Sequence, residues 1–418
     1  MSHTDVPPTA QTLPEFVSQA VNGTDRTFSL YVHVPFCLSR CGYCDFNTYI
    51  SPDLGPGASH DTYATTAIQE LEFAADTLEK SGVNPPPLHS VFFGGGTPTL
   101  LPAEDLNAIL TRAGQLFGIQ QGAEITTEAN PDSLTPQVVQ ELAQGGFNRI
   151  SMGMQSSVSH VLQVLERTHN PDNVAAATAW IQEAELELSL DLIFGTPGES
   201  LADWQRSLDA VLGLRPDHVS AYGLIVEDGT KLAAQIRRGV YLNTDPDDQA
   251  DKYLATEQRL SEAGYRWYEI SNWAYDPANQ GIHKSQHNLA YWRDQDWWGI
   301  GPGAHSHMAG LRWWNAKHPA AYASRVLGNI SPAIGHEIPD DDARLLEKIM
   351  LGVRLAEGLD ISVLADQDHQ AAKQAIAETQ VLATQGLIET SALEEGRIVP
   401  TLRGRLLDDA ITRRLAGF

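Results

Sequence analysis

All three cysteines of this 418-residue chain lie close together, at Cys37, Cys41 and Cys44. An odd and sparse cysteine count excludes a framework of disulfides, whereas the spacing C-x3-C-x2-C in one glycine-containing loop is typical of metal ligands. A zinc site normally takes four ligands, and the nearest histidines, His33 and His60, lack the spacing of a zinc finger. Three thiolates better suit a [4Fe–4S] cluster with one iron left open for a small ligand. A zinc-binding structural protein is the alternative at this point.

Further residues that could bind a ligand stand within or directly after short apolar runs, apart from Arg167, which lies on a helical stretch. Glycines before Thr97 would let the backbone approach a ligand closely. A carboxylate inside an apolar run, such as Asp191, costs free energy unless it has a partner. The residues of this kind are Gly95, Gly96, Thr97, Glu128, Gln155, Arg167 and Asp191. Each alone could be an ordinary turn, cap or surface residue, so only their shared position indicates a site.

The elements that must position these residues alternate between strands and helices from residue 29 to about 225. Strands are predicted at 29–34, 90–93, 124–127, 149–152, 188–193 and 218–222, and amphipathic helices at 61–80, 102–116, 136–144, 172–184 and 201–212. Six strand–helix units in succession predict an α/β fold with a parallel sheet. Functional residues in such sheets gather at the carboxyl ends of the strands, so we expect the cysteines and the polar residues to share one site.

With an aromatic residue, Tyr43, before its third cysteine, the cysteine motif resembles the signature of radical S-adenosylmethionine (SAM) enzymes. The resemblance implies a partial (β/α)6 barrel of the TIM type and a [4Fe–4S] cluster held by the three cysteines. It also implies SAM chelated by the open iron, and an electron from the reduced cluster that cleaves SAM to a radical. Matched residue by residue, it implies SAM contacts from Tyr31, Tyr43, Gly95, Gly96, Thr97, Glu128, Gln155, Arg167 and Asp191.

Within that family, residues 29–418 resemble the subgroup of oxygen-independent coproporphyrinogen III oxidase and its relatives. The oxidase has a further cysteine two residues after the third cluster ligand, where this chain has Phe46. The motif HNxxYW, from His287 to Trp292, is instead similar to that of the HemW haem chaperones. This resemblance implies haem binding and haem delivery to membrane-associated respiratory acceptor proteins, with a homodimer as one form of the protein. Radical decarboxylation of coproporphyrinogen III is the alternative function.

The region around this motif is rich in aromatic residues and histidine. Seven of the nine tryptophans fall between Trp267 and Trp314, and five of the fourteen histidines fall between His283 and His318. A haem needs a flat apolar surface and an axial ligand, commonly histidine. Most of these aromatic residues are better explained as core. His287 is the candidate haem ligand, and His305 and His307 are weaker candidates.

The charge balance limits the classes of partner that the protein is expected to bind. With 28 basic and 53 acidic residues the net charge is −25, which argues against nucleic acid and against an anionic membrane surface. No apolar run reaches the length of about 18 residues that a membrane-spanning helix needs. The N-terminal residues lack the basic and apolar regions of a signal peptide. We therefore expect a cytoplasmic protein with reduced thiols.

Four segments are predicted along the chain: a loose tail over 1–28, the barrel over 29–270, an aromatic and His-rich connection over 271–335, and a smaller domain over 336–418. The second segment ends with a helix over 246–263 and leads into a strand over 267–273. The last is predicted to contain helices, a hairpin of 387–390 with 397–401, and a final helix over 403–415. That combination resembles a winged helix, but its acidic excess favours a structural role over nucleic-acid binding.

Overall fold

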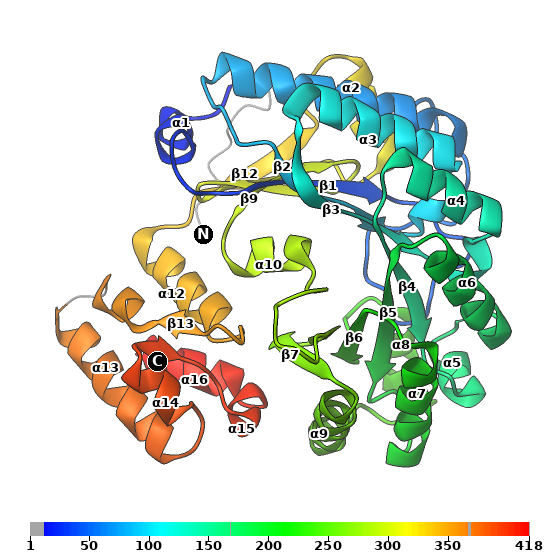
Figure 1. Cartoon of the computed structure of the whole chain (residues 1–418). Coiled ribbons are helices and arrows are strands. Elements are labelled where there is room, and N and C mark those ends of the chain that lie inside the picture. The colour runs from blue at the N-terminus through cyan, green and yellow to red at the C-terminus, as the bar shows by residue number, and fades with distance from the viewer. Residues whose placement is uncertain (1–11, 168, 367–368, 418) are drawn as a thin grey trace.

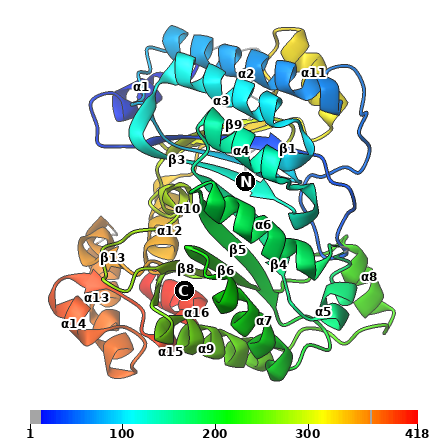
Figure 2. The same cartoon turned by 45° about the vertical axis from the view of Figure 1, so that its right-hand side comes forward.

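The computed structural model describes residues 12–167, 169–366 and 369–417. Its main body is a strongly curved sheet with helices packed on the outer face, and a smaller helical domain lies beside it (Figures 1 and 2). Among the described residues, no helix is long and apolar enough to span a membrane.

Six parallel strands form the centre of the sheet, as predicted. They are β1 (Phe28–Val34), β2 (Leu88–Gly95), β3 (Ile119–Ala129), β4 (Arg149–Gln155), β5 (Glu187–Phe194) and β6 (His218–Gly223). The helices between them are α2 (His60–Lys80), α3 (Ala103–Phe117), α4 (Pro136–Gly145), α5 (Ser159–Val164), α6 (Pro171–Glu183) and α7 (Leu201–Leu214). These units confirm the α/β fold with a partial barrel. Two short 3-10 turns, η1 (Pro98–Leu100) and η2 (Pro131–Ser133), follow β2 and β3.

Local sequence explains where these helices begin and end. In α4 the hydroxyl of Thr135 accepts a hydrogen bond from the backbone N–H of Val138 at 3.2 Å, and Pro136 occupies a first-turn position that needs no donor. Gly146 then ends the helix with a φ of +102°, a conformation that is easy only for glycine.

Side chains on the six strands alternate between an apolar and a polar face. Leu190 and Ile150 point outward and are fully buried beneath the helices. Their neighbours Asp191 and Ser151 point to the inner side and line cavities there. The barrel interior, which we call the lumen, is therefore lined largely by polar groups on β3 to β6.

The chain beyond residue 230 extends the sheet at both edges. After α8 (Lys231–Arg237) and α9 (Pro246–Glu262), the strands β7 (Tyr265–Glu269) and β8 (Asn272–Tyr275) form an antiparallel hairpin beside β6. Then come α10 (Gln286–Trp292), β9 (Asp296–Ile300), β10 (His305–Met308), β11 (Leu311–Asn315), α11 (Pro319–Leu327) and β12 (Ala333–Glu337). The full order is β12-β11-β10-β9-β1-β2-β3-β4-β5-β6-β8-β7. Segment 271–335 is thus an integral part of the sheet.

Two expectations for these regions are wrong. The single strand predicted over 267–273 is two strands, because the chain reverses at Ser271, whose N–H is bonded to the Glu269 carboxylate. The loose tail predicted over 1–28 contains helix α1 (Glu15–Val21), which forms because Val17 and Val21 are buried in the main core.

The smaller domain has its own apolar core, which includes Ile349, Leu382 and Ile411. Its elements are α12 (Asp341–Gly352), β13 (Leu359–Asp360), η3 (Ile361–Asp366), α13 (His369–Thr384), α14 (Thr390–Glu394), β14 (Arg397–Ile398), α15 (Leu402–Arg405) and α16 (Asp408–Leu415). We propose that this domain begins after β12, close to the predicted residue 336.

The structure corrects two details of the smaller domain. β14 pairs with β13 rather than with 387–390, which contributes one isolated bridge from Ile388 to Pro400. The predicted last helix is split into α15 and α16 around Leu406 and Leu407. At this point Arg405 turns back to the main body, stacking over Trp267 at 3.7 Å and pairing with Glu257 at 2.7 Å.

A buried carboxylate fastens the late strands to the barrel. Glu70 of α2 accepts hydrogen bonds from Gly301 N at 2.7 Å, Asn315 Nδ2 at 2.6 Å and Tyr322 Oη at 2.5 Å. Burial raises the pKa of Glu70 to about 7, although these hydrogen bonds act in the opposite direction.

We expect Glu70 to make the protein less stable as the pH rises from about 4.5 to about 7, because the folded state keeps a proton that the unfolded chain has released. Between about pH 5 and 8 the loss is roughly 2 kcal/mol in the free energy of unfolding. Glu70→Gln cannot titrate and should lack this component. Urea unfolding at both pH values measures it, and an equal pH dependence in the two proteins would contradict the assignment.

Candidate functional site

The loop after β1 places the three cysteines at the carboxyl end of the central strands. The loop is closed by backbone hydrogen bonds from Cys37 N to Tyr49 O at 2.9 Å and from Tyr49 N to Pro35 O at 2.7 Å. Cys44 N bonds to Cys41 O at 3.2 Å, which makes a tight turn. All three thiols are half-buried.

The surroundings of the three thiols decide whether the loop fits an iron–sulfur cluster. Burial, with the charge of Cys44 as a second cause, raises the pKa of Cys37 to about 11, and burial also raises the pKa of Cys44. Arg167 Nη1 donates to Cys41 Sγ at 3.5 Å. A bound metal would hold these thiols as thiolates. Three half-buried thiols in one closed loop, with the Arg167 guanidinium beside Cys41, are a donor set that fits the cluster.

Within the described residues, no three His, Cys, Asp or Glu side chains converge as ligands of a single metal ion. A [4Fe–4S] cluster does not require that arrangement, because each cysteine binds a different iron.

A cavity of about 470 Å³ opens beside the cysteine loop and brings most of the sequence-predicted residues together. Those that line it are Cys37, Cys41, Tyr43, Cys44, Gly95, Gly96, Thr97, Glu128, Gln155, Arg167 and Asp191. Tyr31 is the exception. It lies deeper in the lumen, in a second cavity of about 190 Å³.

The glycines at the end of β2 are required by close packing of the backbone. A Cβ on Gly96 would lie 2.3 Å from Phe36 O, and one on Gly95 would lie 2.5 Å from the His33 ring. The absence of side chains lets Gly96 N donate to Val34 O at 2.8 Å. This close backbone contact holds the end of β2 against the cysteine loop and forms one wall of the cavity.

Two carboxylates with perturbed acidity face the same cavity. Glu128 accepts a hydrogen bond from Gly95 N at 3.0 Å, and Ser151 Oγ donates to Asp191 at 3.1 Å. Burial raises the pKa of Glu128 to about 8, with the charge of Asp191 as a second cause. Burial raises the pKa of Asp191 to about 6. A polar or cationic ligand could replace the water that these groups have lost.

Arg167 and Gln155 complete this wall. Arg167 Nη2 donates to Gly153 O at 2.8 Å, while its Nε is buried without a protein partner. Gln155 has a φ of +64° at the end of β4, a strained conformation of the kind often found at functional sites.

The second cavity adjoins the first, deeper in the lumen, and the two share the lining residues Glu128, Ser151, Asp191 and Tyr222. His287, on α10, lies in this part of the lumen and is 1% exposed. Its Nδ1 contacts Ser90 Oγ at 2.8 Å and its Nε2 contacts Tyr291 Oη at 3.0 Å. Burial lowers the pKa of His287 to about 3, so the ring is neutral. Both nitrogens are engaged within the protein.

The two weaker histidine candidates lie elsewhere. His305 is exposed and its ring stacks on Trp314 at 5.8 Å. His307 is buried, with Nδ1 contacting Gln295 O at 2.8 Å and Nε2 accepting from Gly310 N at 3.0 Å. Neither lines the two cavities.

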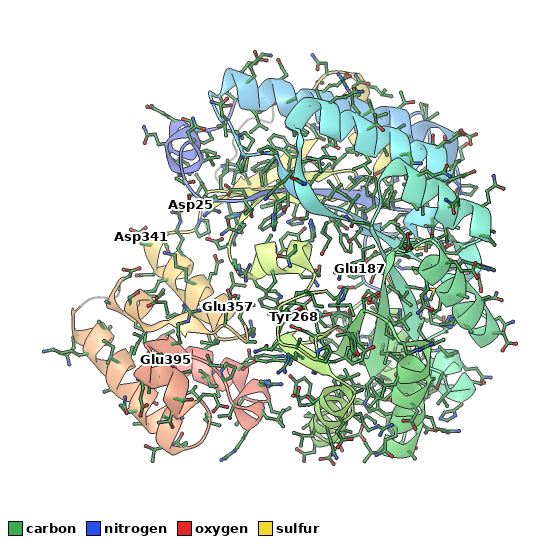
Figure 3. The ribbon with its side chains drawn as sticks, viewed as in Figure 1. Asp25, Glu187, Tyr268, Asp341, Glu357 and Glu395 are labelled. Atoms are coloured by element: carbon green, nitrogen blue, oxygen red, sulfur yellow. The ribbon has the colours of Figure 1, made fainter. Side chains whose placement is uncertain are left out.

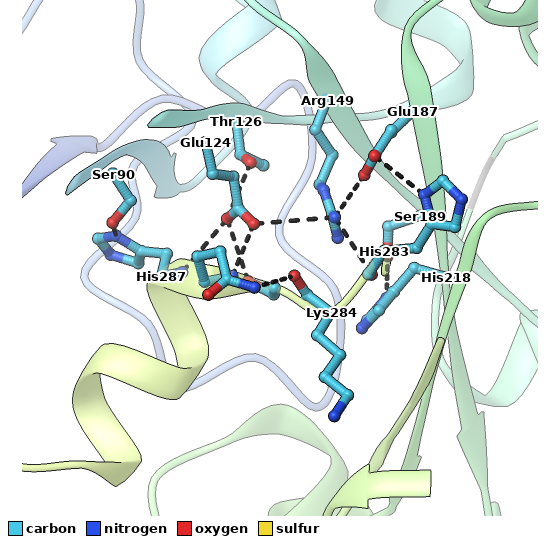
Figure 4. Close-up of polar contacts among 12 residues, drawn as sticks. Ser90, Glu124, Thr126, Arg149, Glu187, Ser189, His218, His283, Lys284 and His287 are labelled. Atoms are coloured by element: carbon cyan, nitrogen blue, oxygen red, sulfur yellow. Dashed lines mark hydrogen bonds and ion pairs between the residues drawn. The ribbon is translucent and has the colours of Figure 1, made fainter. Parts of the chain in front are cut away.

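Sequence analysis missed a polar network at the opposite end of the lumen (Figure 4). Arg149 Nη2 lies 2.5 Å from a Glu187 oxygen and 3.8 Å from a Glu124 oxygen, and Glu187 also contacts His283 Nδ1 at 2.9 Å. The available signal was a polar residue at every second position of two strands, namely Glu124, Thr126 and Glu128 on β3 and Arg149 and Ser151 on β4. Such a pattern in a parallel sheet indicates a polar interior.

Comparisons with known proteins agree with this geometry. The profile of the radical SAM superfamily matches residues 31–211, and that of the HemN C-terminal domain matches residues 340–407. The solved structure of the radical SAM enzyme coproporphyrinogen III oxidase (HemN) from Escherichia coli superposes with a TM-score of 0.78. The superposition covers 98% of this chain and 94% of the oxidase at 23% sequence identity. At this identity the similarity shows that the two proteins share a fold. Fold and cysteine loop together define a protein of the radical SAM class.

Proteins of similar sequence show to which family of the radical SAM superfamily the chain belongs. A Mycobacterium tuberculosis protein named Heme chaperone HemW is 44% identical over 94% of this chain and 95% of its own length. A Bacillus subtilis protein of the same name is 31% identical over 92% and 97%. The mitochondrial radical SAM domain-containing protein 1 of Bos taurus is 34% identical over 81% and 75%. The chain belongs to the HemW family of the radical SAM superfamily, a family whose radical SAM domain implies a [4Fe–4S] cluster and SAM.

We expect Cys41→Ala to abolish cluster binding while leaving the fold intact, because the residue lies in a loop held by backbone hydrogen bonds rather than in the core. Iron and sulfide content after anaerobic reconstitution measures the first effect, and circular dichroism measures the second. Arg40→Ala, in the same loop, is the control that should keep its iron. Collapse of the circular dichroism spectrum in Cys41→Ala would show that the loop is needed for folding.

Proposed function

We propose that this protein is a haem chaperone, which binds haem and transfers it to acceptor proteins. The identity of 44% to a protein named Heme chaperone HemW, sustained along 94% of the chain, carries this proposal. The presence of Phe46 where the oxidase has a further cysteine supports it, since this side chain supplies no thiol at the mouth of the larger cavity.

Cys37, Cys41 and Cys44 would hold the [4Fe–4S] cluster, which when bound supplies an open iron and an electron. SAM would occupy the adjacent cavity, whose volume of about 470 Å³ is ordinary for a small-molecule site. There Glu128 and Asp191 would accept hydrogen bonds, and Arg167 would offset the charge of the thiolates. Tyr31, also predicted to contact SAM, would reach it from the second cavity, deeper in the lumen.

Haem is the third proposed ligand, with His287 as its candidate iron ligand. The acceptors in this proposal include membrane-associated respiratory proteins, and the chaperone is expected to work from the cytoplasm, with a homodimer as one of its forms. Nucleic acid is not an expected partner, because the chain carries a net charge of −25.

One anaerobic assay separates the chaperone from the oxidase. We expect the reconstituted protein, incubated with SAM, dithionite and coproporphyrinogen III, to form no protoporphyrinogen, while haem titration gives a saturable Soret band. Formation of protoporphyrinogen would establish the oxidase instead. A colourless protein after anaerobic purification would support the zinc-binding alternative, and a brown protein excludes that alternative.

The same reaction with SAM and dithionite, analysed for 5′-deoxyadenosine, reports whether SAM is cleaved or only bound.

SAM affinity should increase between about pH 6.5 and 8.5. The sulfonium cation favours the ionised form of Glu128, whose pKa of about 8 in the free protein keeps the group protonated at lower pH. Equilibrium dialysis of SAM measures this trend. Glu128→Gln should remove it, whereas Glu199→Gln, which changes a carboxylate of raised pKa outside the cavity, should keep it. A pH trend unchanged in Glu128→Gln would remove Glu128 from the SAM site.

A further inference from the structure

Helix α10 fills the space in which a larger ligand of the lumen would lie. It packs on the inner side of the curved sheet (Figure 1), and its residues His287, Leu289 and Ala290 are buried. The cavity left beside it measures about 190 Å³, which is below the range of about 300–1,000 Å³ for small-molecule sites. A haem therefore does not fit in this second cavity while α10 is in place.

The ring of His287 is held on three sides. Ser90 on β2 contacts its Nδ1, Tyr291 contacts its Nε2, and Phe92 stacks on its face with ring centroids 5.0 Å apart. A histidine binds iron through a free ring nitrogen. Ligation by His287 therefore requires at least one of these two hydrogen bonds to break.

Glu124 fastens the start of α10 to the sheet (Figure 4). Its carboxylate accepts from Gln286 N at 2.7 Å, from Ser285 Oγ at 3.1 Å and from His287 N at 3.4 Å. Glu124 is 7% exposed, so these hydrogen bonds are shielded from water. Arg149 supports the carboxylate from the opposite side at 3.8 Å.

The connection before α10 can accommodate a displacement, whereas the connection after it is short. Residues 277–282 before it are exposed, and His283 has a φ of +61°. After it, Arg293 is joined to Glu357 of the smaller domain by a half-exposed ion pair of 2.6 Å. Leu289 packs in a small core with Tyr268 and Leu355, and β9 begins only three residues after α10, so the C-terminal end of the helix stays anchored. A displacement of α10 is therefore a swing of its N-terminal end, which is the end that Glu124 holds.

We infer that α10 is a removable plug of the lumen and that Glu124 is the latch that holds it. Haem ligation by His287 takes place only when α10 has left its position. The apparent haem affinity is then the intrinsic affinity multiplied by the fraction of molecules with α10 released. The inference rests on the proposed function, because it takes haem as the ligand of His287.

The test uses the full chain with its cluster reconstituted, titrated with haem and followed by the Soret band. Glu124→Gln retains the shape of the side chain but weakens its hydrogen bonds to α10. Glu199→Gln is the control, since Glu199 is a buried carboxylate whose partners, Gly195 N and Lys252, are not part of α10 or of its connections. His287→Ala and the double variant Glu124→Gln/His287→Ala complete a double-mutant cycle. Hydrogen exchange of residues 285–292 without haem reports release of the plug directly.

We expect Glu124→Gln to bind haem about fivefold more tightly and to exchange faster over 285–292, with Glu199→Gln unchanged. His287→Ala should weaken binding, and the double variant should show no gain over it. Equal affinity in wild type and Glu124→Gln, or a gain that survives loss of His287, would overturn the latch. Absence of haem binding by the wild type would instead overturn the proposed function. If Glu124→Gln does not fold, Ser285→Ala removes one of the hydrogen bonds that Glu124 accepts from the start of α10 and carries the same expectations.

Discussion

The alternation of side chains along six parallel strands is the constraint on which the rest of this molecule depends. Outward-facing residues such as Leu190 and Ile150 are apolar and bind the helices, while their neighbours face inward and are polar. A polar interior cannot be closed by hydrophobic packing, so each buried group needs a partner. At the carboxyl ends these partners would be ligands. At the other end they are supplied by α10 and by the ion pairs of Arg149.

Much of the fold could be predicted because its signals are local. Each central strand is a short apolar run followed by a helical period, and all six were found with errors of a few residues at their ends. The cysteine loop, the glycines at the end of β2 and the carboxylates Glu128 and Asp191 were also found, because all lie within a few residues of the carboxyl end of a strand. Parallel pairing then brings them to one edge without any further information.

The rest depends on contacts between distant parts of the chain. Nothing near Glu124 indicates that it accepts hydrogen bonds from Ser285 and Gln286, or that Arg149 lies between two carboxylates. The burial of His287 was missed for the same reason, since a histidine among aromatic residues is equally compatible with an exposed site. Helix α1 is too short for a clear periodic pattern, and only its packing against the main core keeps it folded.

The position of β1 has a consequence for how the protein is made. This strand pairs with β2 on one side and with β9 on the other, where Phe28 lies opposite Asp296. During synthesis the N-terminal strand–helix units emerge first. Until β9 has left the ribosome, one edge of β1 has no strand beside it, and Gly301 is not yet in place to bond Glu70. The cysteine loop therefore spends most of translation at the border of an unfinished sheet, in contact with the surrounding solution.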